Sequence, residues 1–224
     1  MGPGGTLSFD DPAAIALSVM ALAMLVYGLA LAGRPPSPPR TVVKTLAVAA
    51  LAVAAALLQA PWALVAALVA CAAGDAFLSL DPKRWLPAGL FAFLIGHALY
   101  IALFAAWKDP LLEPGPVRLA AFAAIAALAV TLLAFLWKHL GVLRPAVVLY
   151  VIVISAMTGF SFMLDAAFWP AMVGSVAFLA SDAVLAVSLF RGEVLLGSTR
   201  VTNWTVWFLY CAAQIGITAA FVSL

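Results

Sequence analysis

Three ionisable side chains lie inside segments that are otherwise strongly apolar. Asp75 follows VACAAG, Asp182 follows VAFLAS, and His97 lies in the run FLIGHALY. In a membrane-spanning segment an ionisable side chain costs at least ~2.5 kcal/mol, so it usually faces a bundle interior or a water-filled pocket. We therefore interpret the two aspartates as functional. The alternative is that each carboxyl only forms a hydrogen bond to a neighbouring helix.

The histidine shares its helical face with two aromatic residues. Phe93 lies four residues before His97, and Tyr100 lies three residues after it, so a helix presents all three on one side. An imidazole and a phenol there could donate hydrogen bonds to a substrate or to the aspartates. His97 could instead be a core histidine, and Tyr100 an aromatic packing residue.

Polar and aromatic residues recur at helical spacing near the C-terminus. They form one continuous face and comprise Asn203, Trp207, Tyr210, Gln214 and Thr218. Lipid would leave the amides and hydroxyls of this face without hydrogen-bond partners, so we expect it to point inward. A fainter version of the same pattern contains Tyr150, Met157 and Ser161.

Lys44 and the histidines raise two further possibilities. Lys44 opens an apolar run and could bind a phosphate, but its sequence context alone indicates an ordinary lysine at the membrane boundary. A zinc site needs several His, Cys or carboxylate ligands, whereas His97 and His139 are the only histidines. We expect neither a metal nor another cofactor.

The composition is that of an integral membrane protein. Of 224 residues, 67% are hydrophobic and only 9% are charged, and the mean hydropathy is +1.19, far from the balance of a soluble domain. The formal net charge of +2 and the scattered basic residues argue against nucleic-acid binding, which needs a clustered basic face.

Proline, glycine and charged residues divide the chain into apolar runs long enough to cross a bilayer. We predict an all-α protein that forms one integral membrane domain over residues 1–224, with eight transmembrane helices. The predicted spans are 12–32, 42–59, 62–80, 86–106, 117–136, 145–164, 170–190 and 202–222.

The basic residues predict how these spans are oriented, because Lys and Arg collect in cytoplasmic loops. Nine of them follow spans one, three, five and seven or lie at the adjoining helix ends: Arg34, Arg40, Lys44, Lys83, Arg84, Lys138, Arg144, Arg191 and Arg200. The opposite side has only Lys108 and Arg118. We expect a multi-pass protein of the plasma membrane with both termini on the non-cytoplasmic side.

The two aspartate segments also align with each other, as VACAAGDAFLSL and VAFLASDAVLAV. Both lie on odd-numbered spans, so a parallel repeat of four plus four helices would place them equivalently. Spans one and five are nearly featureless and are expected at the periphery. The predicted pocket is therefore walled by spans three, four, six, seven and eight.

Four short motifs carry a resemblance to a known family. GDAFL at 74–78, FLIGHALY at 93–100, ASDAVLA at 180–186 and YCAAQ at 210–214 are similar to motifs of the YhhN-like lysoplasmalogenase family. The resemblance implies a hydrolase that cleaves the vinyl ether bond of a lysophospholipid substrate, giving a fatty aldehyde and a glycerophospho-alcohol. The matching polar positions are Lys44, Asp75, His97, Tyr100, Asp182, Tyr210 and Gln214.

Two carboxyls suit that chemistry. One can protonate the vinyl ether while the other stabilises the oxocarbenium ion and orients water, as in glycosidases. We therefore predict Asp75, Asp182 and His97 as catalytic; the predicted substrate contacts are Lys44, Tyr100, Tyr150, Asn203, Tyr210 and Gln214. The alternative function is a small-solute or proton-coupled transporter. We expect membrane lipids as neighbours and no nucleic-acid partner, and the sequence predicts no oligomeric state.

Overall fold

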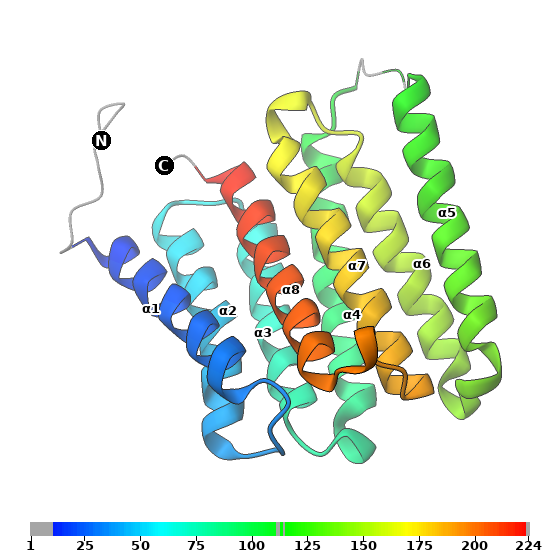
Figure 1. Cartoon of the computed structure of the whole chain (residues 1–224). Coiled ribbons are helices and arrows are strands. Elements are labelled where there is room, and N and C mark those ends of the chain that lie inside the picture. Colours follow the sequence, from blue (N-terminus) through cyan, green and yellow to red (C-terminus); the bar gives the residue numbers. More distant parts are fainter. Residues whose placement is uncertain (1–10, 111–112, 114, 223–224) are drawn as a thin grey trace.

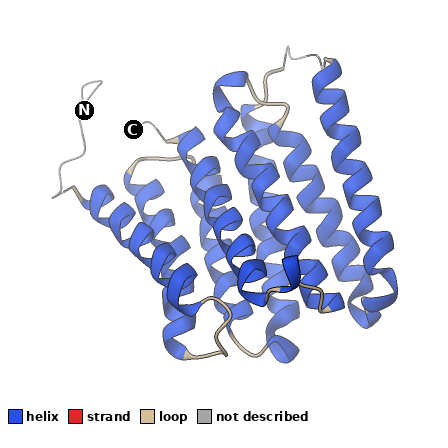
Figure 2. Cartoon of the chain, in the orientation of Figure 1, coloured by secondary structure: helices blue, strands red, loops and turns tan. Residues whose placement is uncertain are grey.

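The computed structural model describes residues 11–110, 113 and 115–222 and is all-α over these residues (Figures 1 and 2). Within these residues eight helices are long and apolar enough to cross a membrane, which confirms the predicted number. They are α1 Pro12–Val26, continued by the π-helical turn η1 Tyr27–Leu31, α2 Pro38–Leu57, α3 Trp62–Ser79, α4 Pro82–Trp107, α5 Pro116–Leu136, α6 Arg144–Ser161, α7 Trp169–Arg191 and α8 Thr199–Phe221.

The proline, glycine and charged residues that divide the sequence into apolar runs also form the helix ends. Proline occupies the first turn of α1, α2, α5, α6 and α7, where its missing N–H costs no hydrogen bond. The Asp11 carboxylate accepts from the Ala13 N–H at 2.8 Å, a typical N-cap. Gly192, with φ of +70°, follows α7.

One boundary differs from the prediction in a way that matters for the site. We placed the start of span two at residue 42, whereas α2 begins at Pro38. The run PPSPP suggested a loop, but two of its prolines form the first turn of the helix, where their fixed φ is compatible with helical geometry. Arg40 and Lys44 are therefore four residues apart on one helix and share a face.

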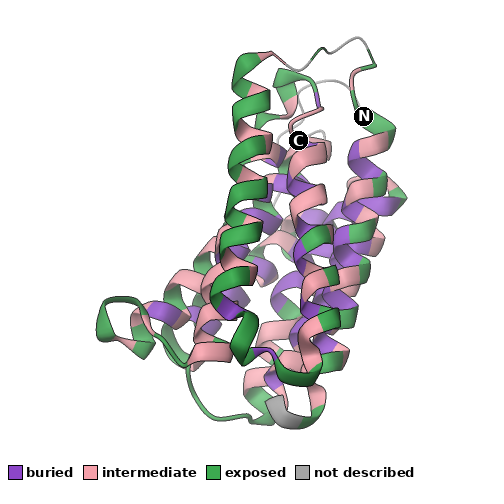
Figure 3. Ribbon diagram, turned by 90° about the vertical axis from the view of Figure 1, so that its right-hand side faces the viewer, coloured by how far each residue is buried: buried purple, intermediate pink, exposed green. Residues whose placement is uncertain are grey.

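Successive helices run antiparallel, so that α1 begins and α8 ends at the same end of the bundle, uppermost in Figure 1. α5 lies at one edge, and only 6% of its apolar window is buried. Seen in front in Figure 3, it is largely exposed. The prediction that span five is peripheral is confirmed. In contrast, five residues of α1 and Tyr27 just after it are buried.

Small residues bring the site-bearing helices close to their neighbours. A Cβ on Gly74 of α3 would lie 2.6 Å from the Phe93 ring of α4. Where α7 meets α8, a Cβ on Gly174 would lie 2.8 Å from the Ala213 carbonyl oxygen. Such contacts let helix backbones approach closely in a membrane, and they fix α3 against α4 and α7 against α8.

Candidate active site

A cavity of about 230 Å³ lies inside the bundle. Its charged lining side chains are Arg40, Lys44, Asp75 and Asp182, and Tyr150 and Tyr210 line it too. These residues lie toward the end where α2, α6 and α8 begin and α3 and α7 end, which is the lower end in Figure 1. The structure thus brings both aspartates to one cavity.

The walls of this cavity are more extensive than predicted. Helices α3, α4, α6, α7 and α8 contribute as expected, and α2, α5 and the turn η1 contribute as well. The restriction to five spans was wrong. Periodicity does not reveal a helix such as α5 that presents only apolar side chains, and Arg40 and Lys44 of α2 had been assigned to the membrane boundary. Leu128 and Leu132 are such side chains of α5.

Asp75 is held by two partners and is only 1% exposed. The Lys44 Nζ lies 2.9 Å from its Oδ1, and the Tyr210 hydroxyl donates to its Oδ2 at 2.7 Å. A buried carboxylate needs such compensation, because removal from water is costly. The charge of Asp75 is therefore balanced within the protein.

Lys44 is not an ordinary lysine at the membrane boundary. Its side chain is only 14% exposed, and its ammonium lies 5.9 Å from the ring centroids of both Tyr27 and Trp207, within the range of a cation–π contact. The interpretation as an ordinary boundary lysine therefore missed its partner, Asp75. The sequence did not reveal the carboxylate that lies opposite.

Asp182 has different partners. The Tyr150 hydroxyl donates to its Oδ2, and the His97 Nε2 lies 3.9 Å from the same oxygen. Lys44 is paired with Asp75 instead, although Asp182 is close enough to both to interact electrostatically. The two carboxyls are therefore chemically unequal, and only Asp75 forms an ion pair with a lysine.

The histidine is fixed in one orientation. Its Nδ1 lies within hydrogen-bonding distance of the Phe93 carbonyl oxygen, which can only accept, so Nδ1 carries the proton. In the neutral ring, Nε2 is then an acceptor. It is buried, has no hydrogen-bond partner and lies beside Asp182. His97 does not line the cavity, so the structure does not bring it to the cavity with the two aspartates. Rings of Tyr150 and Phe178 pack edge-on against the imidazole.

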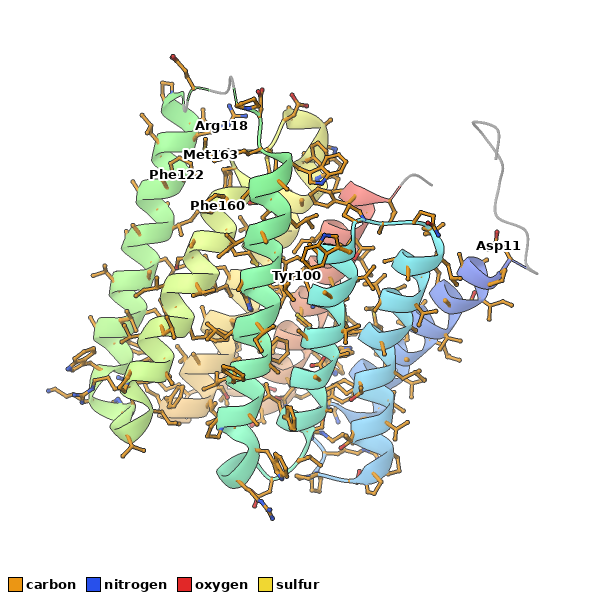
Figure 4. All side chains as sticks on the ribbon, turned by 180° about the vertical axis from the view of Figure 1, so that it is seen from behind. Asp11, Tyr100, Arg118, Phe122, Phe160 and Met163 are labelled. Carbon is orange, nitrogen blue, oxygen red and sulfur yellow. The ribbon has the colours of Figure 1, made fainter. Side chains whose placement is uncertain are left out.

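Two predicted substrate contacts lie outside the cavity lining. The hydroxyl of Tyr100 donates to the Gln214 side-chain carbonyl, both residues are fully buried, and neither lines the cavity. Figure 4 shows Tyr100 within the bundle. Gln214 follows Tyr210 by one helical turn, so this pair supports the cavity wall from behind.

The polar face of α8 points inward as predicted. Trp207, Tyr210, Gln214 and Thr218 are buried, and the Trp207 indole donates to the Met24 carbonyl oxygen at 2.9 Å. Asn203, on the same face, lines the cavity beside Gly33.

Sequence reasoning missed Arg40 and Tyr27 as cavity residues, whereas Trp207, on the face of α8 that was expected to point inward, lines the cavity too. A signal existed for Arg40, which precedes Lys44 by four residues. For Tyr27 there was little signal in the sequence, because it lies in a π-helical turn. Such local irregularities often occur at functional sites.

Known proteins resemble the chain over most of its length. The sequence model of the YhhN family matches residues 39–221. Proteins named lysoplasmalogenase from Mycobacterium bovis and Mycobacterium tuberculosis are each 34% identical over 163 residues, which is 70% of this chain and 59% of theirs. No solved structure matches the chain at a significant level. The matched residues make up most of the chain and include all four charged residues of the cavity. The chain therefore belongs to the YhhN family.

Proposed function

We propose that this protein hydrolyses the vinyl ether bond of a lysoplasmalogen within the membrane. The observation that carries the proposal is the convergence of Asp75 and Asp182 on one cavity with unequal partners. Two carboxyls in different surroundings are a common arrangement for acid-catalysed hydrolysis. Relatives named lysoplasmalogenase support the choice of substrate.

The apolar part of the cavity lining suits a single-chain lipid. Away from the charged residues its walls are formed by leucine, valine and alanine side chains of α4, α5, α6 and α7, for example Leu90, Leu132, Val147 and Leu189. An alkenyl chain there loses contact with water at a gain of roughly 0.8 kcal/mol per buried CH₂. We call this part of the cavity the apolar arm. A chain bound there places the bond to be cleaved near the carboxyls.

Asp182 is the proton donor in this proposal. Lys44 forms its ion pair with Asp75 and not with Asp182. Of the two carboxyls, Asp182 is therefore the one that can hold a proton in apolar surroundings. It transfers the proton to the β-carbon of the vinyl ether, and the ether oxygen then stabilises the resulting oxocarbenium ion. The hydroxyl of Tyr150, which donates to Oδ2, orients the carboxyl for this step.

The remaining groups complete the reaction. The Asp75 carboxylate stabilises the cation electrostatically. Water in the cavity adds to the cationic carbon and returns a proton to Asp182, giving a hemiacetal; the His97 ring lies behind Asp182, outside the cavity lining. The hemiacetal hydroxyl loses its proton while the glycerol oxygen gains one, and the carbon–oxygen bond breaks. The products are an aldehyde and the glycerophospho-alcohol, with one water consumed and Asp182 again protonated.

Purified protein incubated with a lysoplasmalogen tests this function. Aldehyde should form from the vinyl ether lipid and not from its saturated ether analogue, which cannot be protonated at carbon. In D₂O the aldehyde should carry one deuterium on the carbon next to the carbonyl. Movement of an intact solute across proteoliposomes, without aldehyde, would instead support the transporter.

A further inference from the structure

The proposed reaction uses the carboxyls but leaves the positive end of the cavity unexplained. Arg40, Lys44 and Asn203 line this end, next to Gly33. Of the two cations, Lys44 is neutralised by Asp75 at 2.9 Å. Among the described residues Arg40 forms no ion pair, so the polar end has one cation without a protein counter-ion.

The guanidinium of Arg40 is held in place and has a hydrogen-bond donor without an acceptor. Its Nη1 donates to the Ser79 carbonyl oxygen at 2.9 Å, and its carbon lies 5.8 Å from the Tyr27 ring centroid. Its Nε is buried and has no hydrogen-bond partner. Arginine remains protonated in proteins, and a buried donor without an acceptor is costly. An oxygen of a bound ligand would accept a hydrogen bond from this Nε.

Asn203 adds an uncharged donor to the lining of the same cavity. Gly33 has φ of +81°, and a Cβ there would lie 2.6 Å from the Asn203 Nδ2. The left-handed conformation and the missing side chain therefore let the amide lie directly against the loop after η1. A guanidinium and an amide together form a set of donors that suits the oxygens of a phosphate.

We propose that Arg40 and Asn203 bind the phosphodiester of a single-chain lysophospholipid, while the chain occupies the apolar arm. This inference rests on the proposed function and adds to it the group by which the substrate is recognised. The single negative charge of the phosphodiester matches the one uncompensated cation. Phosphate at one end and chain at the other hold the vinyl ether between them, beside Asp75 and Asp182.

Binding of lipids that cannot be hydrolysed tests the phosphate site independently of catalysis. The probes are a saturated ether lysophosphatidylcholine and the matching 1-O-alkylglycerol, which lacks phosphate. Arg40→Gln should weaken binding of the phosphate lipid by about tenfold to a hundredfold, the effect expected for lost charge-assisted hydrogen bonds, and leave the alkylglycerol unchanged. Arg84→Gln is the matched control, because Arg84 is exposed and does not line the cavity.

Three results would overturn the phosphate site. Equal weakening of both lipids would mean that Arg40 only supports the fold, and unchanged binding of both would mean that it contacts no phosphate. Inorganic phosphate that binds as tightly as the lysolipid would identify a site for free anions instead. None of these depends on aldehyde release, so failure of the proposed reaction would be recognised separately.

Discussion

At the scale of single residues, the structure distinguishes two aspartates that the sequence makes look alike. Both follow a small residue in an apolar helix, and local sequence patterns do not indicate which of them is the acid. The difference arises from partners far away in the chain: Lys44 and Tyr210 for Asp75, and Tyr150 for Asp182. Such pairings depend on helix packing, which local patterns do not specify.

The Lys44–Asp75 pair leads to a test of stability. Lys44→Met leaves a buried carboxylate without its cation, and breaking a buried pair from one side costs about 3–5 kcal/mol. The single variant should therefore melt at a clearly lower temperature in detergent. The double variant Lys44→Met with Asp75→Asn removes both charges and should recover most of the loss.

Arg84→Gln provides the control for removal of a positive charge from an exposed position, and its melting temperature should match the wild type. If Lys44→Met alone melts like the wild type, or if the double variant is no more stable than the single one, the pair does not balance charge as described.

At the scale of the helices, composition and punctuation were sufficient to predict most of the architecture. In the part of the chain that the structure describes, eight helices long and apolar enough to span a membrane overlap the predicted ranges, because a bilayer-spanning helix needs a long apolar run and has few alternatives. The inward face of α8 was predictable for the same reason. Its polar residues repeat with the helical period, and they are costly in lipid.

Two local features were not predictable from these rules. The prolines before Arg40 can end a helix or begin one, and only the structure shows that α2 starts there. The participation of α5 was hidden because its cavity residues are apolar and look the same as residues that face lipid. The alignment of the two aspartate segments as a duplication stays a prediction.

At the scale of the whole molecule, the bundle is chemically polarised. The cavity and all four of its charged residues lie toward the end where α2 begins and α3 ends. The sequence predicts that this end is cytoplasmic, because nine of the eleven basic residues are assigned to it. The lipid would then reach the site from the cytoplasmic leaflet.

Labelling of single cysteines tests this orientation in cells. In a background without Cys71 and Cys211, Ala167→Cys, at the end of the bundle away from the cavity, should react with an impermeant thiol reagent added from outside. Val142→Cys, at the opposite end, should react only after the membrane is permeabilised. Both positions are exposed in the structure, so unequal access to the thiol cannot explain the difference. The reverse pattern would place the cavity in the outer leaflet.

The most direct test of the account is the rate of aldehyde release from a lysoplasmalogen by the Asp182→Asn variant. Asparagine keeps the shape of the side chain but cannot supply the proton, so turnover should fall by about a hundredfold or more, with melting temperature and binding of the saturated ether lysolipid nearly unchanged. Asp165→Asn, at an exposed position far along the bundle, should release aldehyde at the wild-type rate. Full activity of Asp182→Asn on a confirmed substrate would contradict the proposed proton donor and the mechanism built on it.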